Sequence, residues 1–463
     1  MPFSSYLDSQ RENARALIAA LAEYCDYVSV LGSDVSSTVA RADRTGMSVK
    51  EGEGECGFVV KMQRGGAFYE YSTNDISGEK KALAAKILEA VACDETLKTV
   101  KSSTVKDPAV KKDFCRENDF NDYSDAQLLA LCRDLSDELC KKDEKVLNAM
   151  AGISLLTVSK LFVSSKKELS QYYGWANGFL FVIYSDGRTV QARKGACGSS
   201  MKEIEKELRE NVDAVLDLAR HLVTATPIEP GVYDVVTDPS ITGLIAHEAF
   251  GHGVEMDQFV KDRALAKQYV GKYVASPITD MHDGAAATLS VASYFFDDDG
   301  VEAHDTQIIE KGILKAGLSD LASAAQLGTA PTGNGRRDNY RRKAYARMTN
   351  TFFCPGKDKL EDMIASIDHG YMLFQTNNGM EDPKNWQIQC TAEYGIEIEH
   401  GKLTDRYVSP VVMSGYVPDL LKSISMISDA FVIEGSGYCG KGYKEWVRVS
   451  DGGPHLKVRV KLG

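Results

Sequence analysis

Residues 243–257 read Gly243-Leu-Ile-Ala-His-Glu-Ala-Phe-Gly-His-Gly-Val-Glu-Met-Asp257. This short stretch sets His247 beside Glu248 and places His252 four residues beyond the glutamate. Just before it stands Asp238-Pro-Ser240, and Asp at the N-cap followed by Pro at the first helical position is a strong helix start. Imidazoles bind Zn²⁺, and a carboxylate can take a proton from a metal-bound water. The stretch therefore predicts a helix that carries a hydrolytic metal site.

The spacing of the two histidines differs from that of the common H-E-x-x-H motif. Here the pattern is H-E-x-x-x-H, and five steps at about 100° each leave the two rings roughly 140° apart on a regular helix. Both rings can reach one ion only if the helix widens into a π-turn, or if it ends inside the motif. Gly251 and Gly253 tolerate either conformation. We therefore predict a distorted helix between His247 and His252.

A third metal ligand has to come from elsewhere in the chain, because zinc hydrolases usually use three protein ligands and leave one position open. Cys439 stands out, since it lies in the glycine-rich run Glu434-Gly-Ser-Gly-Tyr-Cys-Gly-Lys-Gly442. The alternative for this residue is a buried or idle thiol, as for most free cysteines. The residue types leave other ligands open as well, namely any other cysteine and the histidines at 221, 282, 304, 369, 400 and 455.

The order of the expected elements indicates an α+β fold with two domains. Helices and hairpins alternate in the first half, where a short strand is expected over 27–31 and hairpins over 57–71 and 179–193. The run Thr226-Pro-Ile-Glu-Pro-Gly231 marks the boundary, because its prolines and glycine interrupt regular structure. We place an N-terminal mixed sheet-and-helix domain at 1–228. A C-terminal, strand-rich domain that carries the motif helix follows at 229–463, with one of its strands expected over 287–296.

Charge and composition limit the classes of function. The net charge of −12 argues against direct nucleic-acid binding, which needs clustered Lys and Arg. No stretch reaches the ~18 uninterrupted apolar residues of a membrane span, and the first residues lack a signal-peptide pattern. The ten cysteines include no C-x-x-C pair, so a cytoplasmic protein with reduced thiols is the simplest expectation.

Two further segments carry charged groups. Thr332-Gly-Asn-Gly-Arg-Arg337 offers two guanidinium groups in a flexible segment, and we predict that Arg336 or Arg337 binds a peptide carboxylate or orders the site. The alternative is a glycine turn with ordinary surface arginines. Asp297-Asp-Asp299 lacks the alternating ligands of a calcium loop, so we interpret it as a turn.

Taken together, these motifs resemble the TldD/PmbA metallopeptidase family. The resemblance rests on the H-E-x-x-x-H run and on several later stretches that follow in the family's order over roughly 230 residues. These stretches are Phe296-Asp-Asp-Asp-Gly300, Glu310-Lys-Gly-Ile-Leu-Lys315, Thr332-Gly-Asn-Gly-Arg-Arg337, Arg347-Met-Thr-Asn-Thr351 and Tyr438-Cys-Gly-Lys441. One departure is Val254-Glu-Met-Asp257, where the family has a Leu-Glu-Gly-Asp-like run.

The resemblance implies a zinc peptidase that acts on unfolded or extended peptides. It implies that His247, His252 and Cys439 bind the zinc and that Glu248 is the catalytic base. Because this chain has every metal-motif residue, it resembles the TldD-like branch rather than the metal-less PmbA-like one. The family also implies a homodimer or a heterodimer with a PmbA-like partner. Two alternatives remain open: a non-enzymatic regulator that binds a protein or peptide, and a protein whose zinc is purely structural.

Overall fold

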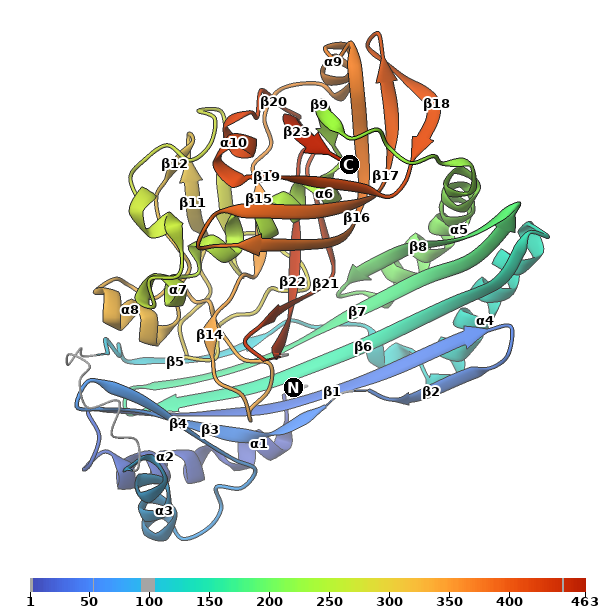
Figure 1. The fold of residues 1–463 in the computed structure, drawn as a ribbon. Helices are drawn as coiled ribbons and strands as arrows, with labels where there is room; N and C mark the ends of the chain where they lie inside the picture. Colours follow the sequence, from blue (N-terminus) through green and yellow to red (C-terminus); the bar gives the residue numbers. More distant parts are fainter. Residues whose placement is uncertain (1–2, 53, 93–104, 444) are drawn as a thin grey trace.

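The computed structural model describes residues 3–52, 54–92, 105–443 and 445–463. One large sheet is built from residues 27–198, and all other sheets begin at residue 231 or later. Figure 1 shows the second half of the chain seated on one face of the long sheet built by the first. Helices and sheets combine as an α+β fold, which confirms the expected fold class. The exact boundary at 228/229 stays a prediction. No helix in the described ranges is long and apolar enough to cross a membrane.

The first sheet has eight strands in the order β4-β3-β1-β6-β7-β5, with β2 paired to β1 and β8 to β7. Its central strands are long: β1 (Tyr27–Asp43) has 17 residues, β6 (Val146–Ser164) has 19 and β7 (Lys167–Asp186) has 20. At about 3.3 Å per residue, each of these strands is long enough to contact several packing partners along its length. The remaining strands are β2 (Met47–Glu51), β3 (Glu55–Arg64), β4 (Ala67–Thr73), β5 (Val110–Cys115) and β8 (Arg188–Gly198).

Helices cover the two ends of this sheet and form separate cores there (Figure 1). At one end, α1 (Ser5–Ser9), α2 (Arg11–Leu21) and α3 (Lys80–Ala92) pack on β1, β3 and β4. At the other end, α4 (Asp125–Lys142) and α5 (Met201–Thr224) bury their apolar stripes on β6, β7 and β8. The opposite face of the sheet packs against the second half of the chain, in part through Val158, Tyr173 and Trp175.

The second half contains a closed barrel. Pairing runs from β9 (Gly231–Thr237) to β16 (His369–Asp382), β17 (Gln387–Glu399), β19 (Val411–Tyr416), β23 (Leu456–Leu462) and back to β9. The strands β18 (Lys402–Val408) and β20 (Met426–Ile427) extend it. Since each of these five strands pairs with two others of the ring, the ring has no unpaired edge strand.

A six-stranded sheet, in the order β12-β11-β10-β15-β22-β21, lies beside the barrel. It ends in the hairpin of β21 (Val432–Lys441) and β22 (Glu445–Gly453), which runs down toward the long sheet in Figure 1. The other strands are β10 (Met281–Asp283), β11 (Thr306–Glu310), β12 (Ile313–Leu314) and β15 (Asn350–Phe353), and β13 (Gly335–Arg336) pairs with β14 (Tyr345–Ala346). Short helices α7 (Met256–Val260), α8 (Leu321–Leu327), α9 (Leu360–Ala365) and α10 (Val417–Lys422) connect these strands.

One strand prediction was wrong, and another was too short. Residues 287–296 form turns and a single bridge rather than a strand. Their apolar side chains Val291 and Tyr294 are buried against the long sheet, so packing between the two halves accounts for their hydrophobicity. The strand expected over 27–31 extends to Asp43. Its polar second part, including Ser36 and Thr38, is held by β6.

Buried ion pairs join the two halves of the chain. The structure confirms the turn at Asp297-Asp-Asp299, which directs the carboxylates of Asp298 and Asp299 toward the long sheet. Lys61 on β3 binds Asp299, and Lys160 on β6 binds Asp298. Glu70 on β4 accepts two hydrogen bonds of 3.2 Å from Arg337, one to each oxygen. These groups form the inter-half ionic network.

Glu70→Gln is expected to lower the free energy of unfolding by about 3 kcal/mol at pH 7, because it leaves Lys61 and Arg337 short of a buried partner. Burial raises the pKa of Glu70, but the two cations outweigh burial and lower it from 4.5 to about 2. A carboxylate with a lowered pKa stabilises the fold above its unfolded pKa, and this stabilisation is lost as the pH falls. Urea denaturation should therefore show the gap between wild type and variant closing between about pH 4.5 and pH 2. A gap that is constant over this range would contradict the assignment.

Candidate metal centre

The motif helix changes its winding at the expected place. It begins at the N-cap Asp238, whose side chain accepts the Ile241 amide, and runs as α6 (Pro239–Leu244). It then widens into a π-helix, η3 (Ile245–Gly251), and tightens into a 3₁₀ turn, η4 (His252–Val254). The His252 amide donates to the His247 carbonyl, which is an i to i+5 bond. The predicted distortion is thus confirmed, and it brings the two imidazoles onto one side of the helix.

Cys439 reaches the two histidines from β21. Ligand atoms of His247, His252 and Cys439 all lie within 4.8 Å of one another. The Cys439 Sγ is 3.4 Å from the His252 Nε2, and the two imidazole rings are 5.2 Å apart and nearly perpendicular. His247 and Cys439 are buried, while His252 is partly exposed. Of the open candidates for a third ligand, the structure therefore brings Cys439 to the motif.

A second group, His369, Glu397 and Glu399, also lies within this distance limit, but Arg406 binds both of its carboxylates.

The three groups polarise one another strongly. Burial alone raises the pKa of the Cys439 thiol, but the two imidazoles outweigh burial and hold that pKa well below its usual value. Burial lowers the pKa of His247, yet attraction to the Cys439 thiolate prevails and raises it to about 9. The same attraction raises the pKa of His252. A negative sulfur that draws positive charge toward itself is the environment in which a divalent cation is favoured.

Buried charges hold His252 in one orientation. Its Nδ1 lies 3.2 Å from an oxygen of Glu255, which leaves Nε2 directed at Cys439. Lys441 in turn donates to Glu255 at 2.9 Å and to Asp257 at 2.7 Å. The run at 254–257 therefore supplies two carboxylates that bind Lys441.

The cysteine ligand is also fixed through its main chain. The buried Arg347 donates to the Cys439 carbonyl at 2.6 Å, and its Nε lies 3.8 Å from Glu255.

Three further carboxyl groups surround the triad of His247, His252 and Cys439. Glu248 lies on the π-helix with an oxygen 3.9 Å from the His252 Nε2. Gly379 on β16 packs against it so closely that a Cβ there would lie 2.5 Å from the Glu248 Cγ. Asp451 on β22 is 3.9 Å from the His247 Nδ1, and burial raises its pKa to about 7. At the far end of β16, burial raises the pKa of Glu381 well above its usual range, and the nearby carboxylates of Glu248 and Glu255 add to this effect.

Arg336 and Arg337 lie apart from this centre, and both are engaged inside the protein. Arg337 is buried in the inter-half ionic network. Arg336 donates at 2.6 Å to the carbonyls of Met348 and Arg448. We expected one of them to bind a peptide carboxylate or to order the site. The observed contacts instead pair both arginines with groups inside the protein. Both residues lie in the part of the second half that packs against the first.

Sequence reasoning did not single out Glu255, Lys441, Arg347, Glu381 or Asp451. Three of these stand inside stretches that carry the family resemblance, namely Glu255, Arg347 and Lys441. Their charge, unusual in otherwise buried segments, was the signal that could have marked them. Glu381 and Asp451 come from distant strands and have no local motif.

Comparison with known proteins places the chain in a family. Residues 230–461 match the model of the PmbA/TldA metallopeptidase C-terminal domain. A metalloprotease of Synechocystis sp. is 32% identical over 71% of this chain and 71% of its own length. A protein of Saccharolobus solfataricus named as a zinc metalloprotease TldD homolog is 33% identical over 53% of this chain and 54% of its own length.

Among solved structures, TldE from Thermococcus kodakarensis aligns with a TM-score of 0.74 at 19% identity. It covers 97% of this chain and 100% of its own. The likeness in structure shows a shared fold. The chain belongs to the PmbA/TldD metallopeptidase family.

Proposed function

We propose that this protein is a zinc-dependent peptidase of the TldD type. The observation that carries the proposal is the convergence of His247, His252 and Cys439, drawn from two segments almost two hundred residues apart, beside the carboxylate of Glu248. Two nitrogens and one thiolate form a donor set that suits Zn²⁺, and three protein ligands leave a fourth position for water or substrate. The names of the relatives support a metal-dependent hydrolytic role.

The residues present fit such an ion. The His247 Nδ1 is buried with no hydrogen-bond partner among the described residues, and Glu255 occupies the Nδ1 of His252. An ion held by His247, by the Nε2 of His252 and by the Cys439 sulfur would use ligand atoms that lie within 4.8 Å of one another. A bound Zn²⁺ would lower the pKa of its water toward about 7 and polarise the scissile carbonyl.

The surrounding carboxyl groups would handle protons. Glu248 accepts a proton from the attacking water and passes it to the leaving amine. Gly379 keeps the Glu248 side chain pressed toward the triad, because the absence of a Cβ lets β16 approach it. Burial raises the pKa of Glu381 well above its usual range and so favours the protonated form, which can donate a hydrogen bond to a substrate carbonyl.

We further propose that the substrates are unfolded or extended peptides. β21 carries Cys439 and is the last strand of its six-stranded sheet. An extended peptide that adds to this edge would be held by its main chain, next to the metal ligand. Such pairing recognises backbone rather than side chains and therefore favours segments without stable structure.

We also propose that the subunit acts as a dimer in the cytoplasm, either with itself or with a PmbA-like, metal-less partner. The observation behind this proposal is the match to TldE, with which this chain shares one fold over nearly its whole length.

Metal analysis together with peptide cleavage tests the main proposal. Protein purified without chelator is expected to contain zinc and to cleave an unstructured peptide, alone or with a PmbA-like partner. A chelator should abolish cleavage, and Zn²⁺ should restore it. Absence of both metal and cleavage would remove the proposal and favour a non-enzymatic regulator. Bound zinc that survives the chelator, without cleavage, would favour a structural ion.

Glu255→Gln is expected to weaken Zn²⁺ binding by about 10–100-fold, because the carboxylate that orients His252 becomes a weaker, neutral acceptor. The measurement is a competition titration against a zinc-binding dye. Glu310→Gln is the matched control, since Glu310 is a partly exposed carboxylate that pairs with Lys315 away from the centre. Equal affinity in the wild type and both variants would show that Glu255 does not support the site.

A further inference from the structure

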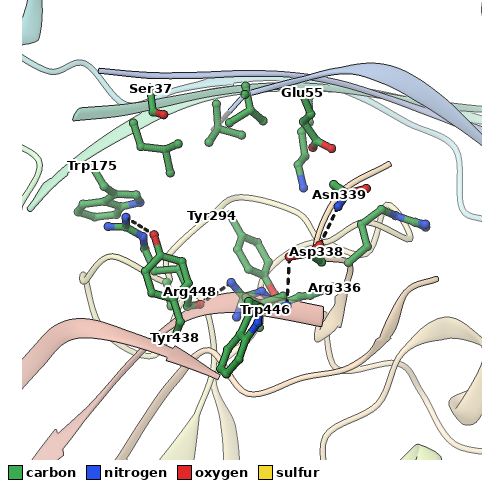
Figure 2. A pocket seen from close by; sticks show the side chains of 18 of the residues that line it. Ser37, Glu55, Trp175, Tyr294, Arg336, Asp338, Asn339, Tyr438, Trp446 and Arg448 are labelled. Carbon is green, nitrogen blue, oxygen red and sulfur yellow. Dashed lines mark hydrogen bonds between the residues drawn. The ribbon is translucent and has the colours of Figure 1, made fainter. Parts of the chain in front are cut away.

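A large cavity separates the middle of the long sheet from the β21–β22 hairpin. Its volume is about 1300 Å³. Figure 2 shows the long strands on one side, with Ser37 and Glu55, and Tyr438, Trp446 and Arg448 of the hairpin on the other. Tyr438 and Trp446 are more than half exposed. The cavity lies on the hairpin that carries Cys439, because Tyr438 precedes the metal ligand directly and pairs with Arg448.

The acidic groups that line the cavity are already occupied. Asp298 binds Lys160, and Asp297 accepts the amides of Asp299, Val301 and Gly335. Glu55 accepts the Tyr340 amide, and Asp338 accepts the Trp446 amide. These four carboxylates therefore have internal partners, and the seven lysine and arginine side chains of the cavity wall outnumber them.

Arg336 and Arg448 are two of the basic side chains of the cavity wall. Arg448 donates at 2.8 Å to the Asn177 side chain and at 2.8 Å to the Tyr438 hydroxyl, both of which are neutral. Arg336 donates to main-chain carbonyls and stacks 5.6 Å from the Tyr294 ring. Neither guanidinium has a carboxylate within ion-pair distance among the described residues. A partly buried cation without an anion is a costly arrangement that a negatively charged ligand relieves.

Two N–H donors of the cavity wall have no hydrogen-bond acceptor among the described residues. The Nε of Arg448 and the Nε1 of Trp175 are both buried without a hydrogen-bond partner among the described residues. Trp175 is 2% exposed and lines the same cavity. It lies two residues from Asn177 on β7, so both side chains point to the same face of the sheet. Figure 2 places Trp175, Tyr438 and Arg448 together at one end of the cavity.

We propose that this end of the cavity binds a peptide carboxylate, with Arg448 and Trp175 as its donors. A carboxylate has two oxygens that accept hydrogen bonds in one plane, which matches a guanidinium and an adjacent indole N–H. Tyr438 and Trp446 would hold the apolar part of the peptide. The carboxylate comes from the C-terminus of the peptide or from an Asp or Glu side chain. This inference rests on the proposed peptidase function and names the feature by which substrates are selected.

The test compares three acetylated pentapeptides: pentaalanine with a free C-terminal carboxylate, the same peptide as an amide, and an amide with one Glu. Binding is measured by calorimetry to the zinc-loaded Glu248→Gln protein, which does not turn the peptides over. At least one of the two carboxylate peptides is expected to bind about tenfold more tightly than the alanine amide. Preference for the free acid identifies a C-terminal carboxylate, and preference for the Glu amide identifies a side chain. Equal binding of all three would overturn the inference.

A carboxylate could also bind the zinc itself, so two further arms locate the preference. It should persist after zinc is removed with a chelator, and it should disappear in Arg448→Gln. Arg209→Gln, which removes the same charge from an exposed site on α5, should keep it. If Arg448→Gln fails to fold, Trp175→Phe keeps an aromatic, though smaller, ring at this position and removes the N–H donor, and it should reduce the preference several-fold. A preference that requires zinc, or that survives both cavity substitutions, overturns the inference.

The outcomes also separate this inference from the proposed function. Wild-type protein that cleaves peptides but shows no carboxylate preference would refute the cavity assignment alone. A carboxylate preference that depends on Arg448, in a protein that never cleaves peptides, would refute the peptidase proposal alone.

Discussion

Glu248→Gln should retain its zinc and lose peptide cleavage by about 10²–10⁴-fold, the range that a positioned general base contributes. Gln has nearly the same size as Glu and fits beside Gly379, so the π-helix and the triad should keep their geometry. What changes is basicity, because an amide cannot accept the proton of the attacking water. The loss should appear in kcat, while KM and zinc content stay close to those of the wild type.

The control is Glu310→Gln, which makes the same chemical change outside the centre. Zinc content by mass spectrometry and turnover of one unstructured peptide should be measured for all three proteins. Full turnover by Glu248→Gln would contradict the assignment of Glu248 as the general base. Loss of zinc in this variant would show instead that Glu248 is a ligand.

Cys439→Ala should weaken zinc binding by more than the about 10–100-fold expected for the loss of a supporting carboxylate. It removes the negative sulfur that raises the pKa of His247 to about 9 and leaves two buried imidazoles with no anionic partner in the triad. Cleavage should fall to background at the zinc concentrations that saturate the wild type. Competition titration and activity at rising Zn²⁺ measure both effects.

Cys132→Ala is the matched control, because Cys132 is a fully buried thiol in the core between α4 and the long sheet. It should lower stability and leave zinc affinity unchanged. If Cys439→Ala binds zinc as tightly as this control does, the cysteine is not a ligand.

The local part of the site could be predicted from the sequence. A five-residue interval between His247 and His252 does not fit a regular helix, and this conflict predicted the distorted turn that the structure contains. The start at Asp238 follows from side-chain capping and proline geometry, which act within a few residues. Cys439 needed the family resemblance as well, because nothing local says which distant strand returns to a helix.

The remaining features depend on contacts between distant segments. Glu381 and Asp451 enter the site from the ends of β16 and β22 and carry no motif of their own. Arg337 looked available for a ligand, but its partner Glu70 lies in the other half of the chain. The apolar residues near 291 suggested a strand, since periodicity does not distinguish a buried loop at an inter-half contact from a buried strand.

The closed barrel has a consequence for the order in which the protein matures. β23 (Leu456–Leu462) lies between β9 and β19, so the ring cannot close until a segment more than two hundred residues beyond β9 has been synthesised. Cys439 is likewise made long after His247. Pairings of such separation form late, because the intervening chain must be ordered first. The long sheet, built from the first two hundred residues, can fold on the ribosome while the metal centre is still incomplete. A nascent chain would therefore lack the assembled triad of His247, His252 and Cys439 during translation.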